Sequence, residues 1–135
     1  STRAYQPMNI SHYKTTWIGD NASWSEPSWP GRMSDGNWWD QERLREHYRP
    51  WIQLAEHGVG VHCGEGGAYK HTPHEAMLAW LRDVLEIFRD AGIGYALWNF
   101  RGNFGILDSG RTDVEYEDWY GHRLDRRLLS LLQEF

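Results

Sequence analysis

The chain has little of three things: cysteine, long apolar runs and clustered positive charge. Its single cysteine, Cys63, has no second cysteine with which to form an internal disulfide. No apolar run approaches the ~18–20 residues that a membrane-spanning helix requires, and no signal peptide opens the chain. The 19 acidic and 14 basic residues give a net charge of −5, and no run of Lys or Arg follows a helix face. Nucleic acid and anionic membranes are therefore not expected partners.

Tryptophan and tyrosine, by contrast, are abundant, with nine and seven copies in 135 residues. Five of the tryptophans fall within one stretch that is also rich in Gly, Pro, Ser, Asn and Asp: Trp17, Trp24, Trp29, Trp38 and Trp39. Such a composition is typical of a loop. Bulky aromatic side chains on a loop either close the end of a core or line a cleft, and both interpretations remain open for this stretch.

The first part of the chain predicts a long loop followed by two helical segments. Residues 1–39 show no sustained period and are expected to form an ordered loop with a short strand at its start. Asp40 is a good N-cap for a helix over 41–48. Proline is unfavourable inside a helix, so Pro50 predicts a second segment, which ends at Gly58.

The rest of the chain alternates strands with amphipathic helices. Strands are expected over 59–63 and 95–99. Between them, the sequence of residues 72–75 (Thr-Pro-His-Glu) resembles a capping box, and apolar residues at helical spacing predict a helix that ends at Gly92. A polar loop over 101–121 precedes a last helix. The leucines expected to be buried by this last helix are Leu124, Leu128, Leu131 and Leu132.

This alternation predicts a single α/β domain over residues 1–135, with parallel strands joined by right-handed crossovers. Two full strands do not close a sheet. Parallel sheets need both faces covered, and their open edges are unfavourable in water. We therefore expect the domain to be part of a larger structure.

The glycine-rich segment 58–69 carries the first candidate for catalysis. A short run with Val59 and Val61 leads to Glu65, which two further glycines follow. In barrel enzymes, the chemistry lies at the carboxyl ends of the strands. The next expected strand ends with Trp98 and Asn99, so one strand supplies a charge and the next an aromatic face. This combination indicates a site that processes sugars.

Four motifs in this order resemble the C-terminal part of glycoside hydrolase family 5, the cellulase-like retaining enzymes built on a (β/α)8 barrel. Arg3–Pro7, followed by Ser11-His12-Tyr13 and Trp17, is similar to the segment after the sixth strand of the family's barrel. Gly64–Gly67 is similar to the end of the seventh strand, and Trp98–Phe100 to the end of the eighth strand. Gly105–Gly110 and the last helix are similar to the C-terminal end of the family's barrel.

The resemblance implies a partial (β/α)8 TIM barrel: the C-terminal two to three βα units, with parallel strands and outer helices. It implies that Glu65 is the catalytic nucleophile, that Tyr5 donates a hydrogen bond to it, and that Trp98 is the platform on which the sugar stacks. Further candidates for substrate binding are Trp17, His12 and Asn99.

The implied activity is O-glycosyl hydrolysis of a β-linked glucan or mannan by retaining double displacement, with an endo-β-1,4-glucanase as the leading candidate. Such enzymes need two carboxyl groups ~5–5.5 Å apart. The family's acid/base glutamate has no counterpart here, so we expect this chain to supply the nucleophile half and to be inactive alone. It would need the N-terminal half of the barrel, or self-association through its open sheet edges. The reaction requires no cofactor and no metal, and the parent enzyme is expected to be secreted.

Two positions depart from the family pattern. Gly66 stands where an aromatic residue is usual, which is expected to loosen the backbone beside the nucleophile. Arg3 replaces the histidine of the usual His-x-Tyr. An ordinary structural role for Glu65, paired with an arginine such as Arg101, is the alternative to catalysis.

Two other functions are open. The first is a non-catalytic half-barrel, or a module that binds polysaccharide through exposed tryptophans. The second, ranked last, is a zinc site drawn from His62, Cys63, Glu65, His71 and His74. Because His62 and Cys63 point to opposite faces of one strand, only part of this set could reach one ion.

Overall fold

Three parallel strands form the centre of the protein in this computed structural model, which describes residues 1–19 and 21–135. The strands are β1 (Thr2–Ala4), β4 (His62–Gly66) and β5 (Gly94–Tyr95), in the order β1-β4-β5. Because β4 is central, its two neighbours are the edges of the sheet. The predicted α/β fold with parallel strands is confirmed.

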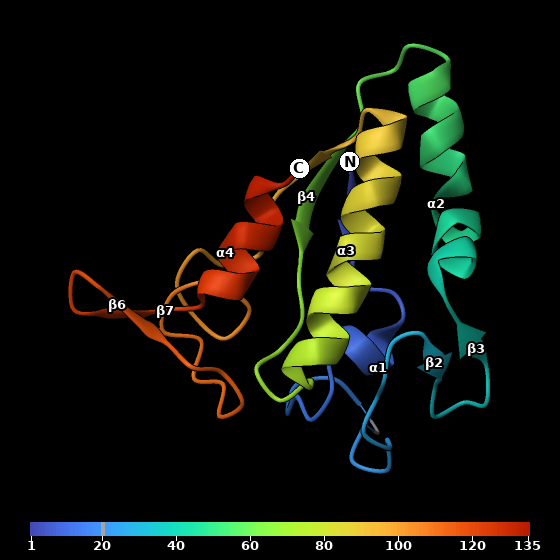
Figure 1. Ribbon diagram of the computed structural model, residues 1–135. Coiled ribbons are helices and arrows are strands. Elements are labelled where there is room, and N and C mark those ends of the chain that lie inside the picture. Colours follow the sequence, from blue (N-terminus) through green and yellow to red (C-terminus); the bar gives the residue numbers. More distant parts are fainter. Residues whose placement is uncertain (20) are drawn as a thin grey trace.

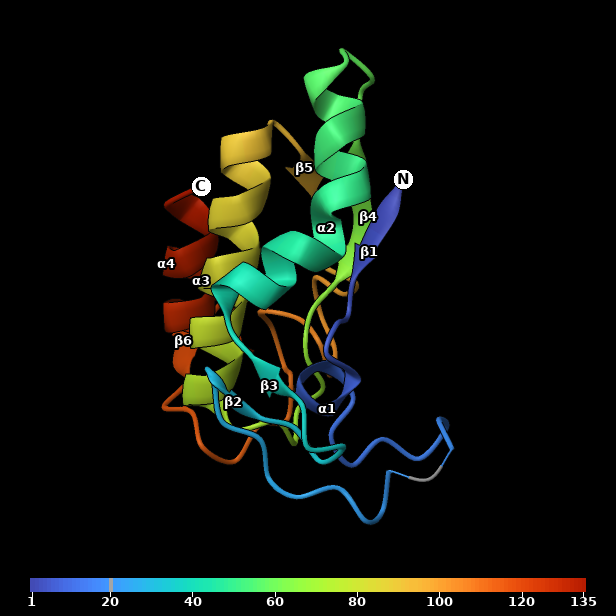
Figure 2. The same cartoon turned by 90° about the vertical axis from the view of Figure 1, so that its right-hand side faces the viewer.

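Helices cover one side of this sheet (Figures 1 and 2). Helix α2 (Gln41–Glu56) precedes β4, and α3 (His74–Ala91) connects β4 to β5. These two helices lie side by side, and α4 (Arg126–Gln133) lies on the other flank of α3. The arrangement matches outer helices around part of a barrel.

Short elements fill the end toward which the strands run. Helix α1 (Met8–Ser11) and the hairpin of β2 (Gly31–Arg32) and β3 (Trp38–Trp39) lie there. A second hairpin, β6 (Glu117–Trp119) with β7 (His122–Leu124), projects sideways from the body (Figure 1). It lies in the segment predicted as a loop over 101–121 and at its border.

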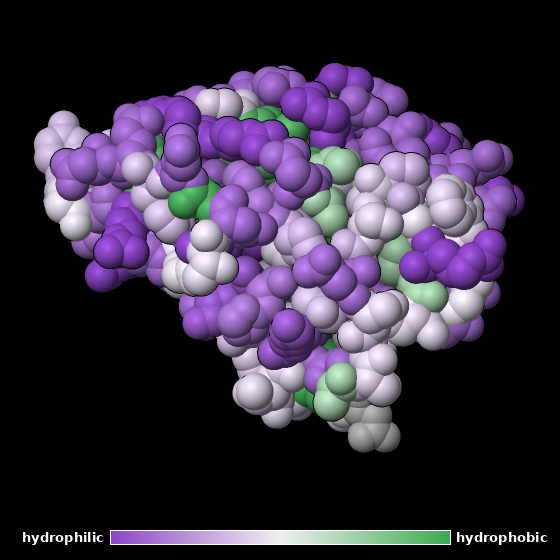
Figure 3. Space-filling model, turned by 60° about the horizontal axis from the view of Figure 1, so that its bottom comes forward, coloured by the Kyte–Doolittle hydropathy of each residue, from purple (hydrophilic) through white to green (hydrophobic). Residues whose placement is uncertain are grey.

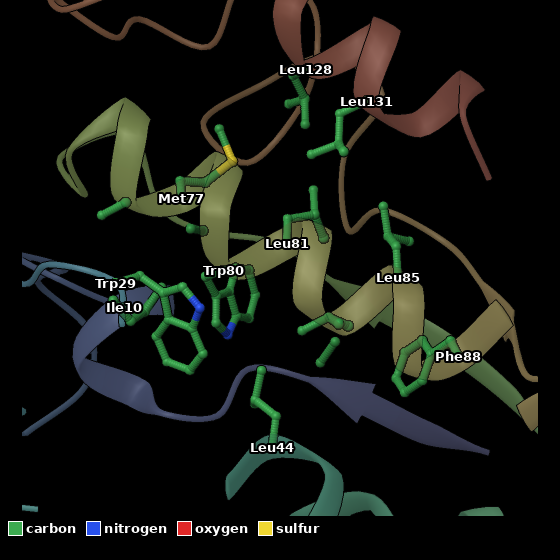
Figure 4. Packing of buried hydrophobic residues seen from close by; sticks show 14 of the residues in the cluster. Ile10, Trp29, Leu44, Met77, Trp80, Leu81, Leu85, Phe88, Leu128 and Leu131 are labelled. Atoms are coloured by element: carbon green, nitrogen blue, oxygen red, sulfur yellow. The ribbon is translucent and has the colours of Figure 1, made fainter. Parts of the chain in front are cut away.

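The apolar stripe of α3 forms the middle of the core. Met77, Leu81 and Leu85 face Leu128 and Leu131 of α4 (Figure 4). Trp80 lies on the other side of α3, and its indole Nε1 donates to the backbone oxygen of Gln6 at 2.9 Å. A fully buried tryptophan needs such a partner for its N–H group. The helical period therefore predicted this face correctly.

Helix α2 corrects the expectation of two segments. It runs unbroken through Pro50, although its direction changes in its middle (Figure 2). Proline removes one hydrogen bond of the helix and forces a bend, but it does not end a helix that is otherwise well packed. Leu44 and Tyr48, before Pro50, are fully buried. Trp51 and Ile52, after it, pack partly buried against the same core, so packing on both sides of the proline compensates for the lost bond.

Both predicted strands are also shifted. Strand β4 begins three residues later than expected, and Val59 is half-exposed in the turn that follows α2. Strand β5 is shorter than expected, yet the backbone continues beside β4: the amides of Ala96 and Trp98 donate to the oxygens of Cys63 and Gly66, each at 2.9 Å. The chain thus stays extended as far as the Trp98 amide.

The start of α3 differs from a capping box. The Thr72 hydroxyl donates to the backbone oxygen of Ile10, and no side chain of the helix caps it. Instead, the amide of His74 donates to Asp113 Oδ2 at 2.8 Å. The C-terminal end is as predicted, because Gly92 adopts a left-handed conformation with φ of 69°. At the last helix, Asp125 is the N-cap, and Leu124 lies in β7 rather than in the helix.

Candidate functional site

Glu65 is the penultimate residue of the central strand, in register with Arg3 of β1. Its carboxylate forms an ion pair with the Arg3 guanidinium. The expected alternative partner, Arg101, instead pairs with Asp108 at 2.6 Å. The Glu65 side chain is partly exposed, and it stands at the end of the sheet where the connecting loops gather.

Cys63 lies on the same strand, two residues before Glu65, and its side chain is buried. The Cys63 thiol donates to the Glu65 backbone oxygen at 3.2 Å. Burial raises the pKa of this thiol to about 11, so it stays protonated at neutral pH. Cys63 is therefore a packed strand residue rather than a nucleophile or a metal ligand.

Tyr5 follows β1 and lies beside Glu65. Burial, and then the negative charge of Glu65, raise the pKa of the Tyr5 phenol to about 12. The phenol is thus a protonated donor at neutral pH. The predicted hydrogen bond from Tyr5 to Glu65 is not formed: among the described residues, Arg3 is the donor to this carboxylate.

Tyr5 belongs to a cluster of five rings from three loops, which we term the aromatic cluster. Its members are Tyr5, His12, Trp17, Tyr69 and Phe104. Ring centroids are 5.0 Å apart for Tyr5 and His12, 6.3 Å for His12 and Trp17, and 5.1 Å for Trp17 and Tyr69. Phe104 lies within 6.4 Å of the other four. Trp17 is 57% exposed, whereas His12, Tyr69 and Phe104 are buried. The cluster therefore presents the Trp17 indole to solvent on a packed base.

His12 is held by a short relay. The Ser11 hydroxyl donates to the backbone oxygen of Tyr5 at 2.5 Å, so it accepts from His12 Nδ1 at 2.7 Å. Burial lowers the pKa of His12. The imidazole is therefore neutral at pH 7, with its proton on Nδ1.

Trp98 and Asn99 follow β5 and are not among the five rings of this cluster. Trp98 is 54% exposed, one strand over from Glu65. Asn99 Oδ1 accepts from the amide of Phe104 at 3.4 Å, so the side chain closes a turn of the loop that carries Phe104. The structure thus brings Tyr5, His12 and Trp17 together, and Asn99 supports the loop that carries Phe104 of the same cluster.

Arg111 is a residue that the sequence analysis missed. Its guanidinium is buried and donates to the backbone oxygens of Thr72, Ala68 and Tyr69 at 2.6, 2.9 and 3.3 Å. These contacts hold the loop after β4, and with it the Tyr69 ring. A lone arginine in a polar loop has no period or motif by which sequence could reveal this role.

Gly66 also corrects an expectation. A Cβ atom there would lie 2.7 Å from Cβ of Ala4 and 3.0 Å from Cε2 of Tyr95. The backbone beside Glu65 is therefore tightly packed rather than loosened, and glycine is required by the close approach of the neighbouring strands.

The face that carries these groups is mixed in character (Figure 3). White and purple residues surround small, separate green areas on it. In the described part of the chain, no group of three or more His, Cys, Asp or Glu side chains is arranged to hold a metal. None of the described helices is long and apolar enough to span a membrane.

Comparison with known proteins places this arrangement in context. No protein-family model and no curated protein matches the chain. Among solved structures, the chain is similar to one described as a glycoside hydrolase, with 41% identity and a TM-score of 0.91 over 98% of this chain and 40% of that one. It is also similar to Thermotoga maritima Cel5A in complex with mannotriose (22% identity, TM-score 0.72, 96% and 37%) and to a hyperthermophilic endo-β-1,4-glucanase with substrate (22%, 0.66, 97% and 38%).

The resemblance to glycoside hydrolase family 5 is confirmed. The chain has the α/β fold of part of a family 5 barrel, and it spans about two fifths of the length of these structures. The catalytic roles of Glu65 and Tyr5 in this family 5 fold stay predictions, as do the substrate-binding roles of Trp98, Trp17, His12 and Asn99.

Proposed function

We propose that this chain supplies the nucleophile half of a retaining hydrolase that acts on a β-linked polysaccharide, in the manner of an endo-β-1,4-glucanase. The observation that carries the proposal is the place of Glu65: a partly exposed carboxylate at the carboxyl end of the central parallel strand, with the protonated Tyr5 phenol beside it. Parallel barrels keep their catalytic groups at this end.

The chemistry assigned to each residue follows from this geometry. A Glu65 oxygen would attack the anomeric carbon and form a covalent glycosyl ester, while the bond to the leaving oxygen breaks. Tyr5 would donate its phenolic proton to a hydrogen bond with Glu65 and so orient the carboxylate. Trp98 and Trp17, both more than half exposed, would pack against the C–H faces of sugar units.

The proton for the leaving oxygen must come from a second carboxyl group. We propose that it lies on the remaining strands of a barrel, which would pair with the two edges, β1 and β5. A cleft of about 540 Å³ runs beside β5, lined by apolar side chains that include Leu97 and Phe100. Phe100 is exposed there, which supports an edge that another piece of barrel, or a second copy of the chain, would cover.

A module that binds polysaccharide without cleaving it is the second candidate. The exposure of the Trp17 and Trp98 indoles favours it, since stacking alone needs no acid. In that case, the chain would bind β-glucan with Glu65 present or replaced.

Covalent labelling tests the nucleophile directly. A 2-deoxy-2-fluoro-β-cellobioside with a dinitrophenolate leaving group needs no protonation to react, so the missing acid does not block the first step. We expect intact-protein mass spectrometry to show one sugar adduct, and peptide mapping to place it on Glu65. The Glu65→Gln variant should stay unlabelled, whereas the control Glu56→Gln, at an exposed position at the end of α2, should label normally.

The outcomes separate the two candidates. An adduct that persists in Glu65→Gln, or no adduct at all, would contradict the nucleophile role. Retention on a β-glucan gel without labelling would instead support the binding module.

A further inference from the structure

The chain contains two lysines, Lys14 and Lys70, among its 14 basic residues; the other twelve are arginines. The lysines are 56 positions apart in the sequence. The fold brings their loops together, because the Tyr69 amide donates to the Ser11 backbone oxygen at 2.9 Å, and the charges of both lysines act on His71. Lys14 follows α1, and Lys70 and His71 lie in the loop after β4. We term these three residues the lysine rim.

The lysine rim adjoins the aromatic cluster. The His71 ring lies 5.3 Å from the Tyr69 ring, which also contacts the exposed Trp17 at 5.1 Å. Lys14 places its Nζ 5.2 Å from the centre of the Tyr13 ring. Lys70 lies across Gly110: its Nζ is 3.8 Å from the position that a Cβ atom would occupy there. Starting from Glu65, the order of contacts is thus Tyr5, His12, Trp17, Tyr69 and then the rim.

The charge of the rim is not neutralised by the acids around it. Half of the arginines form ion pairs with Asp or Glu, but within residues 1–19 and 21–135 neither lysine does. Burial, and then the charges of Lys70, Lys14 and Arg111, lower the pKa of His71. The rim is therefore a positive region on a chain whose net charge is −5.

The use of lysine at these two positions has a chemical consequence. Arginine forms rigid, two-pronged pairs, whereas the lysine ammonium is a compact and mobile charge on a flexible stem. Two such groups beside the aromatic cluster suit reversible contact with an anionic group whose position varies between sugar units.

We propose that the lysine rim is a subsite for a carboxylate-bearing sugar unit, so that the substrate class is a β-linked glycan with anionic residues. The inference rests on the proposed function, because it assumes that the aromatic cluster holds the neighbouring part of the glycan. What it adds is that the lysine rim selects a negatively charged sugar unit at the end of the aromatic cluster that lies farthest from Glu65.

Affinity electrophoresis of the full chain in two cellulose derivatives tests this selection. Carboxymethyl cellulose carries carboxylates on the same backbone that hydroxyethyl cellulose presents without charge. We expect about tenfold tighter binding to the carboxymethyl polymer at low ionic strength, falling toward the neutral value as salt screens the contact. The Lys14→Gln/Lys70→Gln variant should bind both polymers equally. The matched control is Arg45→Gln/Arg49→Gln, which removes the same charge from exposed positions of α2 and should keep the preference.

Each result is decisive. Equal binding of both polymers by the native chain overturns the inference and leaves the proposed function standing. A preference that survives in the double lysine variant also overturns it. Failure to bind the neutral polymer counts against the proposed function, and failure to bind either polymer overturns both.

The scarcity of lysine allows a second, site-resolved measurement. Reductive methylation with ¹³C-formaldehyde keeps the charges and gives NMR signals from the two lysines and the N-terminal amine alone. Titration with a glucuronate-bearing β-1,4-linked oligosaccharide should shift both lysine signals and leave the N-terminal one unchanged. The neutral oligosaccharide of equal length should leave the lysine signals in place. Equal shifts with both sugars, or a shift of the N-terminal signal alone, would contradict the assignment.

Discussion

Replacing Arg111 with methionine would show how firmly the loop after β4 is held. The guanidinium is buried, and its three hydrogen bonds all go to backbone oxygens of the segment 68–72. That segment carries Tyr69, on which Trp17 packs edge to face at 5.1 Å. Methionine has a similar length and fills the space, but it leaves these oxygens without their donors.

The size of the effect follows from these contacts. A hydrogen bond with a charged partner contributes about 1.5–3 kcal/mol. The bonds to Thr72 and Ala68 are short, at 2.6 and 2.9 Å, and the third, at 3.3 Å, is weaker. The gross loss is roughly 3–6 kcal/mol, which the relief of burying a charge reduces. Burial lowers the pKa of Arg111, which shows that this cost is present. We expect a net loss of about 3 kcal/mol, or a fall in Tm of roughly 10 °C for a chain of this size.

Urea denaturation followed by far-UV circular dichroism measures this loss. Arg111→Lys should fall between the native chain and Arg111→Met, since lysine keeps the charge and loses the two-pronged geometry. Arg45→Met, on the exposed side of α2, is the control and should change the free energy of unfolding by less than about 0.5 kcal/mol. A loss below about 1 kcal/mol for Arg111→Met would refute the assignment of Arg111 as the residue that holds this loop.

Four further predictions concern the strands, the helix caps and the activity. Gly66→Ala should destabilise the fold by about 1–3 kcal/mol in urea denaturation, because the new Cβ would lie 2.7 Å from that of Ala4, whereas Gly64→Ala, with open space around it, should not. Tyr95→Phe should stabilise by up to about 1 kcal/mol, because the Tyr95 hydroxyl is buried without a hydrogen-bond partner among the described residues; a loss would contradict this. Burial raises the pKa of Asp125, but hydrogen bonds from His74 and the Leu128 amide outweigh it, so the pKa is lowered overall. The carboxylate therefore contributes fully to the stability of the fold above its unfolded pKa of about 3.9, and this contribution is lost as the pH falls through the lower folded pKa. The gap in stability between the native chain and Asp125→Asn should therefore be constant near pH 6 and shrink below about pH 3.9. The chain alone should show negligible turnover of an aryl β-cellobioside whose leaving group, unlike dinitrophenolate, needs protonation, since the missing acid costs at least ~10²–10⁴ in rate. Turnover that Glu65→Ala abolishes would count against this.

The parts of the fold that depend on local chemistry could be predicted from the sequence. The helix α3 was predicted because its apolar residues recur at helical spacing, and its end because Gly92 supplies a left-handed residue. The parallel strands followed from their alternation with helices. Each of these signals is contained within about twenty neighbouring residues.

The errors arose where a distant contact decides the outcome. The start of α3 is capped by Asp113, which is 39 positions away, so the local Thr-Pro-His-Glu motif was misleading. Pro50 does not end α2, because the buried Leu44 and Tyr48 stabilise the helix against the sheet and α3. No local rule contains either contact.

The candidate site shows the same division. Glu65 and Trp98 could be singled out because Glu65 follows the predicted strand 59–63 and Trp98 lies at the end of the predicted strand 95–99. Tyr69 and Phe104 gave no signal, since they join the aromatic cluster only when the loops after three strands converge. The pairing of Glu65 with Arg3 likewise depends on the register between β1 and β4, which the sequence does not encode locally.

The ion pair between Arg3 and Glu65 is compatible with the proposed role of Glu65 as a nucleophile. The Arg3 side chain is 72% exposed, and an ion pair with one such exposed partner contributes only about 0–1 kcal/mol. A sugar unit that enters beside Glu65 can therefore displace Arg3 at little cost. Tyr5 is the protonated donor next to the same carboxylate, and the charge of Glu65 already contributes to the raised pKa of its phenol. We propose that displacement of Arg3 leaves Tyr5 as the partner of Glu65, so that the two arrangements would be successive states of one site.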